Sequence, residues 1–213
     1  MFLTLSLVAG IAGPAAAQSA AELCTQLSNV TVGQWAEYRM TVPQMGNDPV
    51  QMRMAVVGTE AVNGKAHHWH ELKMAGRQGT MIIQVLVPGY PYEVSDIAGM
   101  VMKAGDQPAM RMPDQMIGMM AQRAGAGSNM VRDAMKQCDG ATVVGNERVT
   151  VPAGAFETVH LRAGEGGTDV WVARDMPFGV IQMRAANGES MVLLGHGTDA
   201  TSSITETPQE MGR

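Results

Sequence analysis

The chain contains little positive charge. Its 213 residues include fifteen Lys and Arg against twenty Asp and Glu, which gives a formal net charge of −5 at pH 7. Proteins that bind nucleic acid concentrate Lys and Arg on one face or along one helix, and the sequence has no such basic stripe. A nucleic-acid partner is therefore excluded from the function classes that we consider.

Long hydrophobic runs are also missing. The mostly apolar run from Phe2 to Ile11 is shorter than the roughly 18 to 20 apolar residues that span a bilayer. Pro14 and the small residues Ala15 to Ala17 follow it. A short apolar core followed by a small-residue cleavage site is typical of a secretory signal. We expect a signal peptide at 1–17, no stable membrane span, and a mature protein that is periplasmic or secreted.

Recognisable catalytic motifs are absent from the sequence as well. It has no Gly-x-Ser-x-Gly nucleophile elbow, no phosphate-binding Gly-x-x-x-x-Gly-Lys loop and no dinucleotide fingerprint, and its carboxylates show no diagnostic pairing. Without a set of residues to which catalytic roles can be given, we expect no enzyme activity, no catalytic residue and no cofactor.

Cysteine is scarce, with only Cys24 and Cys138. Ser19 and Glu22 form a capping box at the start of a short predicted helix that places Cys24 on its apolar face. A second predicted helix, over 128–138, places Cys138 on an apolar face in the same way. In an oxidising compartment such a pair predicts a disulfide. The alternative is that both are small buried hydrophobic residues.

Alternating apolar and polar residues fill most of the remaining sequence. Such alternation, bounded by Gly, Pro, Asn or Asp, predicts half-buried antiparallel strands. Asn63-Gly64, between two alternating runs, is a strong hairpin signal. The predicted strands are 34–42, 50–57, 66–74, 80–87, 141–151, 155–162, 169–174, 179–184 and 190–196.

The segment from about 94 to 137 differs in composition from the strands. It is rich in Met, Ala, Gly, Asp and Lys, and Pro113 is suited to the start of a helix. We therefore predict a helical insertion there, within one β-rich domain over 18–200, followed by a polar, disordered tail over 201–213. The predicted fold class is α+β, with a curved antiparallel sheet (an unclosed half-barrel) and helices that cover its concave face.

Methionine is the most distinctive residue, with twenty in the chain. One interpretation is that Met replaces Leu as the long core residue, and another is that it forms an adaptable apolar surface for a ligand. A third is a soft-metal site, because thioethers select Cu(I). The possible ligand pairs are Met52 with Met54, Met100 with Met102, and Met110 with Met112. The predicted apolar lid consists of Met112, Met116, Met119 and Met120.

A histidine cluster spans 67–71, with the sequence His-His-Trp-His-Glu. On a strand, His68 and His70 project from the same face and could ligate Zn or Cu together with a third group. Neither a Cys nor an Asp follows at diagnostic spacing, and Met74 stands where the helical zincin signature needs a second His. An ordinary polar strand face is the simpler interpretation. His160 and His196 are interpreted as ordinary strand residues.

Three runs in the second half resemble a known group of proteins. They are Val149 to Phe156, Asp169 to Val172, and Met176 to Ile181. They resemble uncharacterised bacterial envelope proteins that look like relatives of the LolA and LppX lipoprotein carriers. The resemblance implies an unclosed β-barrel that is lined with apolar side chains and lidded by helices, and it implies no catalytic residue.

Together, these features favour a periplasmic, non-catalytic protein that binds an apolar ligand, such as a lipid or a lipoprotein acyl chain. One alternative is a copper-binding envelope protein rich in Met and His. Another is an envelope interaction protein without a small-molecule ligand, whose partner is a second envelope protein.

Overall fold

The computed structural model describes residues 19–27, 29–43, 48–77, 79–124, 138, 140–163 and 167–211. The expected signal peptide at 1–17 lies outside the described residues. So does the expected second cysteine helix, apart from Cys138 itself.

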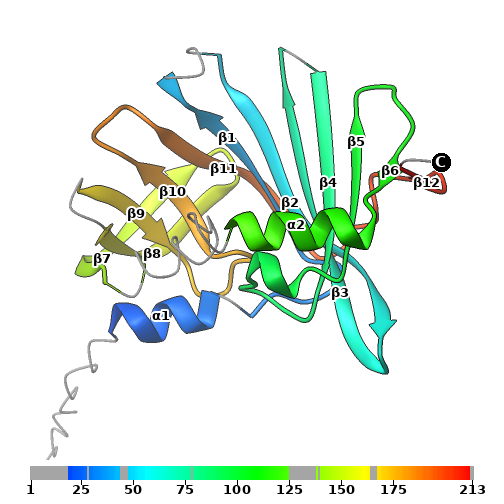
Figure 1. Cartoon of the computed structure of the whole chain (residues 1–213). Helices are drawn as coiled ribbons and strands as arrows, with labels where there is room; N and C mark the ends of the chain where they lie inside the picture. Colours follow the sequence, from blue (N-terminus) through cyan, green and yellow to red (C-terminus); the bar gives the residue numbers. More distant parts are fainter. Residues whose placement is uncertain are drawn as a thin grey trace, which may run out of the picture.

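One large β-sheet makes up most of the described chain (Figure 1). Its strands are β1 (Trp35–Thr41), β2 (Val50–Val62), β3 (Lys65–Gly76), β4 (Gly79–Val87), β5 (Gly99–Ala104), β6 (Met110–Arg111), β7 (Thr142–Val151), β8 (Gly154–Ala163), β9 (Thr168–Val172), β10 (Val180–Arg184), β11 (Ser190–Gly197) and β12 (Gln209–Glu210). They follow the order β12-β6-β5-β4-β3-β2-β1-β11-β10-β9-β8-β7, so that β12 and β7 are edges and the sheet is not closed. Each pair is antiparallel except β12 with β6.

The predicted α+β class with helices over the concave face is wrong. The described residues contain two short α-helices, α1 (Ala20–Leu27) and α2 (Asp114–Ala124), and a 3₁₀ turn, η2 (Val94–Asp96). Helix α1 contacts β8 and β9, while α2 packs near β4 and β5. Each helix therefore covers a small part of the sheet, and the protein is predominantly β.

The predicted helical insertion at 94–137 is also wrong in its first part. Residues 99–104 and 110–111 form β5 and β6, which extend the sheet beyond β4. Met100 and Met102 point to the same side of β5, as alternate strand residues do. The helix that does form, α2, begins directly after Pro113, as predicted.

The first hairpin follows the sequence prediction closely. Asn63 and Gly64 connect β2 to β3, and both have positive φ angles, of 50° and 74°. A two-residue turn with positive φ at both positions matches the right-handed twist of the flanking strands. The turn therefore fixes the β2–β3 register as far as Gly58, where a bulge between Val56 and Gly58 shifts it by one residue.

The register gathers the methionines on one side of the sheet, because directly opposed strand residues share a face. This side is called the methionine face. It carries Met40, Met52, Met54, Met74, Met81, Met100, Met102, Met110, Met183 and Met191. Both helices also lie on it, because α1 packs against Leu161 and α2 against Val85.

The opposite face is covered by the last part of the described chain. The predicted disordered tail at 201–213 is wrong for residues 201–211. Residues 198–211, called the strap, run from β1 across the sheet and end as β12 beside β6. Ile204 of the strap is buried in a cluster with Ile82, Val101 and Ala109. The polar composition of the strap does not reveal its order, because two buried apolar residues, Ala200 and Ile204, and a few hydrogen bonds hold it in place.

Glu71 makes the most extensive contact between sheet and strap. Its carboxylate is buried, and it accepts hydrogen bonds from the backbone N–H of Ser203 (2.8 Å), the hydroxyl of Ser203 (2.7 Å) and Nε2 of Gln84 (2.8 Å). Gln84 also donates to the hydroxyl of Ser202 at 2.7 Å. A buried carboxylate is tolerated when it is hydrogen-bonded in this way, so the serines of the strap complete its environment.

Candidate functional site

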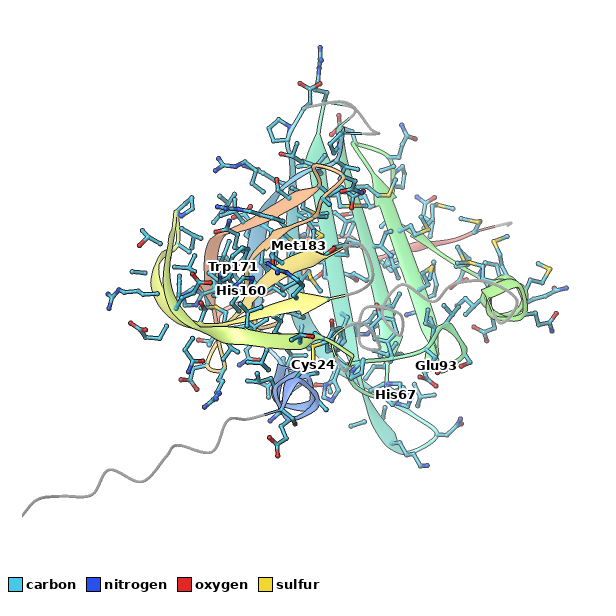
Figure 2. The ribbon with its side chains drawn as sticks, turned by 90° about the vertical axis from the view of Figure 1, so that its left-hand side faces the viewer. Cys24, His67, Glu93, His160, Trp171 and Met183 are labelled. Carbon is cyan, nitrogen blue, oxygen red and sulfur yellow. A yellow bond between two sulfur atoms is a disulfide. The ribbon has the colours of Figure 1, made fainter. Side chains whose placement is uncertain are left out.

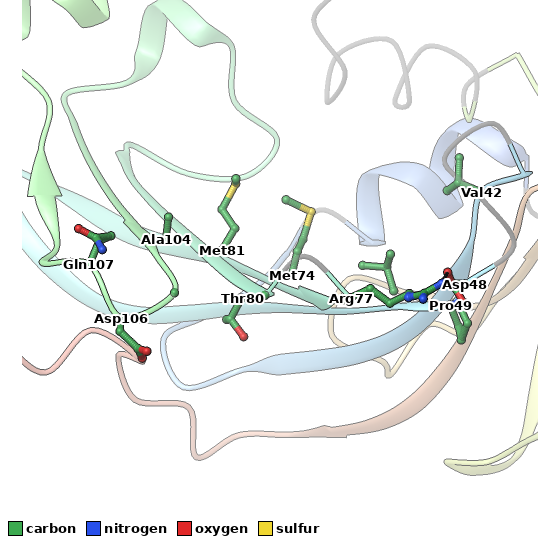
Figure 3. A pocket seen from close by; sticks show the side chains of 14 residues that line it. Val42, Asp48, Pro49, Met74, Arg77, Thr80, Met81, Ala104, Asp106 and Gln107 are labelled. Carbon is green, nitrogen blue, oxygen red and sulfur yellow. Dashed lines mark hydrogen bonds and ion pairs between the residues drawn. The ribbon is translucent and has the colours of Figure 1, made fainter.

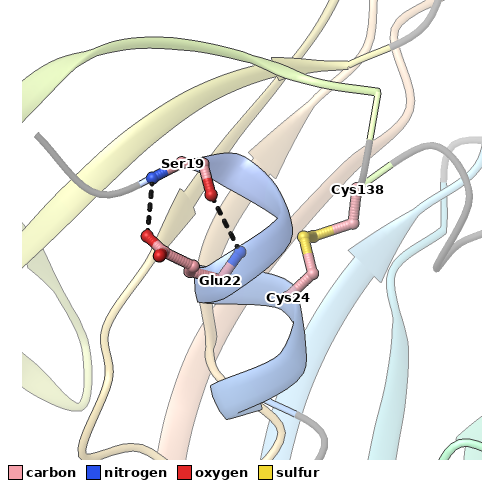
Figure 4. Close-up of a disulfide and its surroundings, with 4 residues drawn as sticks. All are labelled: Ser19, Glu22, Cys24 and Cys138. Carbon is pink, nitrogen blue, oxygen red and sulfur yellow. Dashed lines mark hydrogen bonds between the residues drawn. A yellow bond between two sulfur atoms is a disulfide. The ribbon is translucent and has the colours of Figure 1, made fainter.

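The disulfide predicted from the sequence is present. Cys24 and Cys138 are bonded, with their Cα atoms 6.0 Å apart (Figure 4). The predicted capping box is present too: Ser19 N–H donates to the Glu22 carboxylate at 3.0 Å, and Glu22 N–H donates to the Ser19 hydroxyl at 3.3 Å. Helix α1 is therefore fixed at its first turn by its cap and at its middle by the disulfide.

An apolar cavity of about 260 Å³ lies beside this disulfide, on the methionine face. Its walls come from α1, from the segment after β4 and from strands β8 to β11. The lining residues are Cys24, Tyr90, Cys138, Ala141, Leu161, Ala163, Thr168, Val170, Val172, Phe178, Val180, Met183 and Met191. Only Tyr90 and Thr168 contribute a polar side-chain atom, and no lining residue is charged.

Tyr90 lines this cavity and also belongs to a group of packed rings with His70, Tyr92 and Phe178. Its ring stacks on His70, with centroids 5.8 Å apart and planes 14° apart, and meets Phe178 edge-on at 5.9 Å. Tyr92 approaches His70 edge-on at 5.8 Å. Burial, followed by repulsion from His68, lowers the pKa of His70 from 6.5 to about 4. His70 is therefore a neutral ring at neutral pH and acts as part of an apolar wall.

Tyr38 is a second buried ring on this face. Its hydroxyl finds no hydrogen-bond partner among the described residues. Burial raises the pKa of Tyr38 well above its usual value. The hydroxyl is therefore protonated and provides a polar atom within an otherwise apolar cluster that includes Val56 and Leu193.

A second hollow, of about 820 Å³, lies at the ends of β2 to β5 (Figure 3). Met74 and Met81 rise side by side from neighbouring strands along one part of it. An ion pair between Arg77 and Asp48, 2.8 Å apart and exposed, lies at another part. This hollow is a broad, mixed surface, unlike the apolar cavity beside the disulfide.

The four predicted lid residues differ in burial. Met112 is buried against Met100 and Ile117, whereas the other three, Met116, Met119 and Met120, are exposed on α2. Ile117 of α2 packs towards the sheet. A role for the three exposed methionines in binding a ligand stays a prediction.

The predicted metal pair lies as expected on one face of β3. His68 and His70 are opposite Val87 and Val85 of β4, and Nδ1 of His68 is buried without a partner among the described residues. No group of three His, Cys, Asp or Glu side chains suited to a metal ion occurs in the described part of the chain. The arrangement thus lacks the third ligand that a zinc site requires, and metal binding by this pair stays a prediction.

One polar cluster was missed at the sequence level. His160 lies between the carboxylates of Glu147 (3.0 Å) and Asp169 (2.8 Å). Its ring stacks on Trp171, with ring centroids 4.5 Å apart, and both side chains are labelled in Figure 2. Hydrogen bonds from His160 and then Arg162 lower the pKa of Asp169. These side chains come from β7, β8 and β9, so only the strand register brings them together. They lie on the face opposite the methionines, away from the apolar cavity.

Fold and cavity together define a β-sheet protein with a partly open apolar site next to a disulfide-anchored helix. No protein family model matches the sequence, and no curated protein matches it. Neither described helix has the length and hydropathy of a membrane-crossing segment.

Two solved structures are similar to the chain at low scores. One is a candidate exported protein with a YmcC-like fold from Bacteroides fragilis, with a TM-score of 0.38, 13% identity, and 80% of this chain and 98% of that chain covered. The other is a candidate lipoprotein from Parabacteroides distasonis, with a TM-score of 0.37, 10% identity and the same coverage. Neither name mentions a LolA or LppX carrier, and we transfer no binding property at such scores.

Proposed function

We propose that this protein is a non-catalytic protein of the bacterial envelope that holds an apolar ligand of the acyl-chain type in the cavity beside Cys24 and Cys138. The disulfide suits the oxidising conditions outside the cytoplasm. The words "exported" and "lipoprotein" in the names of the two similar structures agree with the signal peptide expected at 1–17.

The cavity itself carries the proposal. Its volume is about 260 Å³, and its lining is almost entirely apolar. An apolar cavity of about 150 Å³ stays free of water and binds small apolar molecules such as benzene. The cavity beside the disulfide is partly open, but its lining is apolar in the same way and favours an apolar occupant, and its size suits a single chain better than a whole lipid.

The apolar surface continues beyond the cavity onto the methionine face. Met183 and Met191 belong both to its lining and to the methionine face. Methionine side chains adapt their shape to irregular apolar ligands. A ligand longer than the cavity could thus continue over the half-buried methionines of the neighbouring strands.

Binding of a fluorescent fatty acid, cis-parinaric acid, tests the proposal. The mature protein is prepared from periplasm with its disulfide intact, extracted to remove lipid, and titrated. Ala163→Leu fills part of the cavity because Ala163 is buried in its lining. We expect this variant to weaken binding by about tenfold or more, which corresponds to about 1.4 kcal/mol.

Ala61→Leu is the matched control, because Ala61 is exposed on β2 and does not line the cavity. It should bind the probe as the wild type does. Equal affinities for the wild type and Ala163→Leu, with both folded by circular dichroism, would contradict binding in this cavity. Mass spectrometry of the lipid extract then identifies any natural ligand.

A further inference from the structure

Three methionines lie in one row across the methionine face. Met52 of β2 is directly opposite Met74 of β3, and Met74 is directly opposite Met81 of β4. Directly opposed residues of antiparallel strands have Cβ atoms about 4.5 to 5.5 Å apart. Figure 3 shows Met74 and Met81 on the same side of their two strands. The row thus brings three thioether groups within reach of one another.

The sequence alone suggested a different pairing. Met52 and Met54 are two residues apart on one strand, which separates their Cα atoms by about 7 Å. The cross-strand neighbours are closer, but Met52 and Met74 are 22 positions apart in the sequence, and Met74 and Met81 are 7 apart on different strands. Only the register reveals that Met74 lies between Met52 and Met81.

This row is more exposed than the core, although Met52 packs against the core cluster of Tyr38 and Val56. Met81 is 40% exposed, and Met52 and Met74 are half-buried, whereas Met100 on the same face is 6% exposed. Met74 and Met81 also form part of the wall of the hollow at the strand ends, which opens to solvent. An ion can therefore reach Met74 and Met81 from the hollow, and half-buried Met52 lies directly opposite Met74, one strand further from the hollow.

The chemistry of the row selects one class of ion. Thioethers are soft, neutral ligands that favour Cu(I) over hard cations such as Mg²⁺ and Ca²⁺. Flexible, unbranched methionine side chains can converge on a small ion. The adjoining row on this face, Met54, Leu72 and Ile83, is apolar, so it supplies no carboxylate that would recruit a hard ion.

We propose that Met52, Met74 and Met81 form a three-thioether site for Cu(I). The site is separate from the apolar cavity, and the proposal does not depend on the binding of an acyl chain. Met74 is the central ligand, because it lies beside both of the others.

Competition with bicinchoninate tests the site. The disulfide-bonded protein is titrated with Cu(I) under anaerobic conditions with ascorbate, and copper transfer from the coloured chelator complex is followed by absorbance. We expect one equivalent to bind through sulfur alone, as judged by X-ray absorption. Met74→Leu, which conserves volume, should lower the affinity by about tenfold or more. Met81→Leu is the second variant, because an exposed side chain can be replaced without effect on folding.

Met100→Leu is the matched control, since Met100 is a buried methionine on the same face. It should leave Cu(I) affinity unchanged. A second row, formed by Met183, Met191 and Met40, offers a competing location. Unchanged binding in both Met74→Leu and Met81→Leu would overturn the proposal. So would loss of copper only in Met191→Leu, or nitrogen coordination that is abolished by His68→Ala.

Discussion

His70 is a histidine that is held neutral by its surroundings. It stacks on Tyr90, meets Tyr92 edge-on, and lies in register between Val56 and Val85. Such a site stabilises the uncharged ring and opposes protonation. The aromatic group around His70 therefore makes the stability of the fold depend on pH.

We predict that the free energy of unfolding decreases as the pH falls from 6.5 to about 4. The folded protein keeps His70 neutral down to a pKa of about 4, whereas the unfolded chain takes up the proton near 6.5. The unfolded state thus binds more protons in this window, and the loss amounts to about 2 kcal/mol by pH 5. Urea unfolding at pH 7 and pH 5 measures it.

His70→Phe keeps an aromatic ring but removes the titration, so its stability should change less with pH than that of the wild type. His67→Phe serves as the control, because His67 is on the opposite side of β3 and only half-buried. The same pH dependence in His70→Phe and the wild type would show that other groups cause it.

Individual site residues were predictable to different degrees. The same-face placement of His68 and His70 follows from strand alternation alone, and the disulfide follows from two cysteines on apolar helical faces. The hydrogen bonds between Glu71 and Ser203 were not predictable, because the two residues are 132 positions apart. The row of Met52, Met74 and Met81 depends on register in the same way.

The strap is the element whose role is least apparent from its sequence. It is anchored at one end where the Ala200 N–H donates to the Gly33 carbonyl, and further along where Lys103 pairs with Glu206. Between these points Ile204 is its main apolar contact with the sheet. The Ile204 side chain therefore contributes much of the apolar packing between the strap and the sheet.

We predict that Ile204→Ala lowers the free energy of unfolding by about 3 kcal/mol, because it removes a buried side chain and leaves a cavity against Ile82 and Val101. Thr205→Ala, at the exposed neighbouring position, should change stability by less than about 0.5 kcal/mol. Chemical denaturation of the two variants provides the comparison, and equal small effects would mean that the strap contributes little to the fold.

Among the elements, alternation identified nine strands and the Asn63-Gly64 turn, because a sheet with one buried face has period two. It failed for β5 and β6, which are short and occur among Met and Ala, residues with high helix propensity. It also failed for the strap, whose order depends on tertiary contacts rather than on a local pattern. Local signals thus predicted nine strands, but not β5, β6 and β12, which form one edge of the sheet.

For the molecule as a whole, the disulfide is the longest covalent constraint. Cys24 and Cys138 are separated by 114 positions, so the closed loop includes β1 to β6 and α2. In the chain-entropy treatment a loop of this length stabilises the folded state by about 5 kcal/mol. Reduction should therefore lower the melting temperature markedly.

Calorimetry with and without reductant measures this effect, with the double variant Cys24→Ser and Cys138→Ser as the control for the chemistry of the reductant. The variant should resemble the reduced protein and should not respond to reductant. Two thiols that react with an alkylating agent before reduction would contradict the assigned bond.

Strand β1 lies in the middle of the sheet, between β2 and β11, so one of its two sides cannot pair until the end of the chain is present. One side of β1 pairs with β2, which follows it closely in the sequence. The other side pairs with β11, where Trp35 is opposite Gly197, about 160 residues further along the chain. At a synthesis rate of about 5 to 20 residues per second, roughly 10 to 30 s pass before that partner exists. An open strand edge is a template for aggregation during this time. The pairing of β1 thus makes the folding of this sheet depend on contacts between the two ends of the chain.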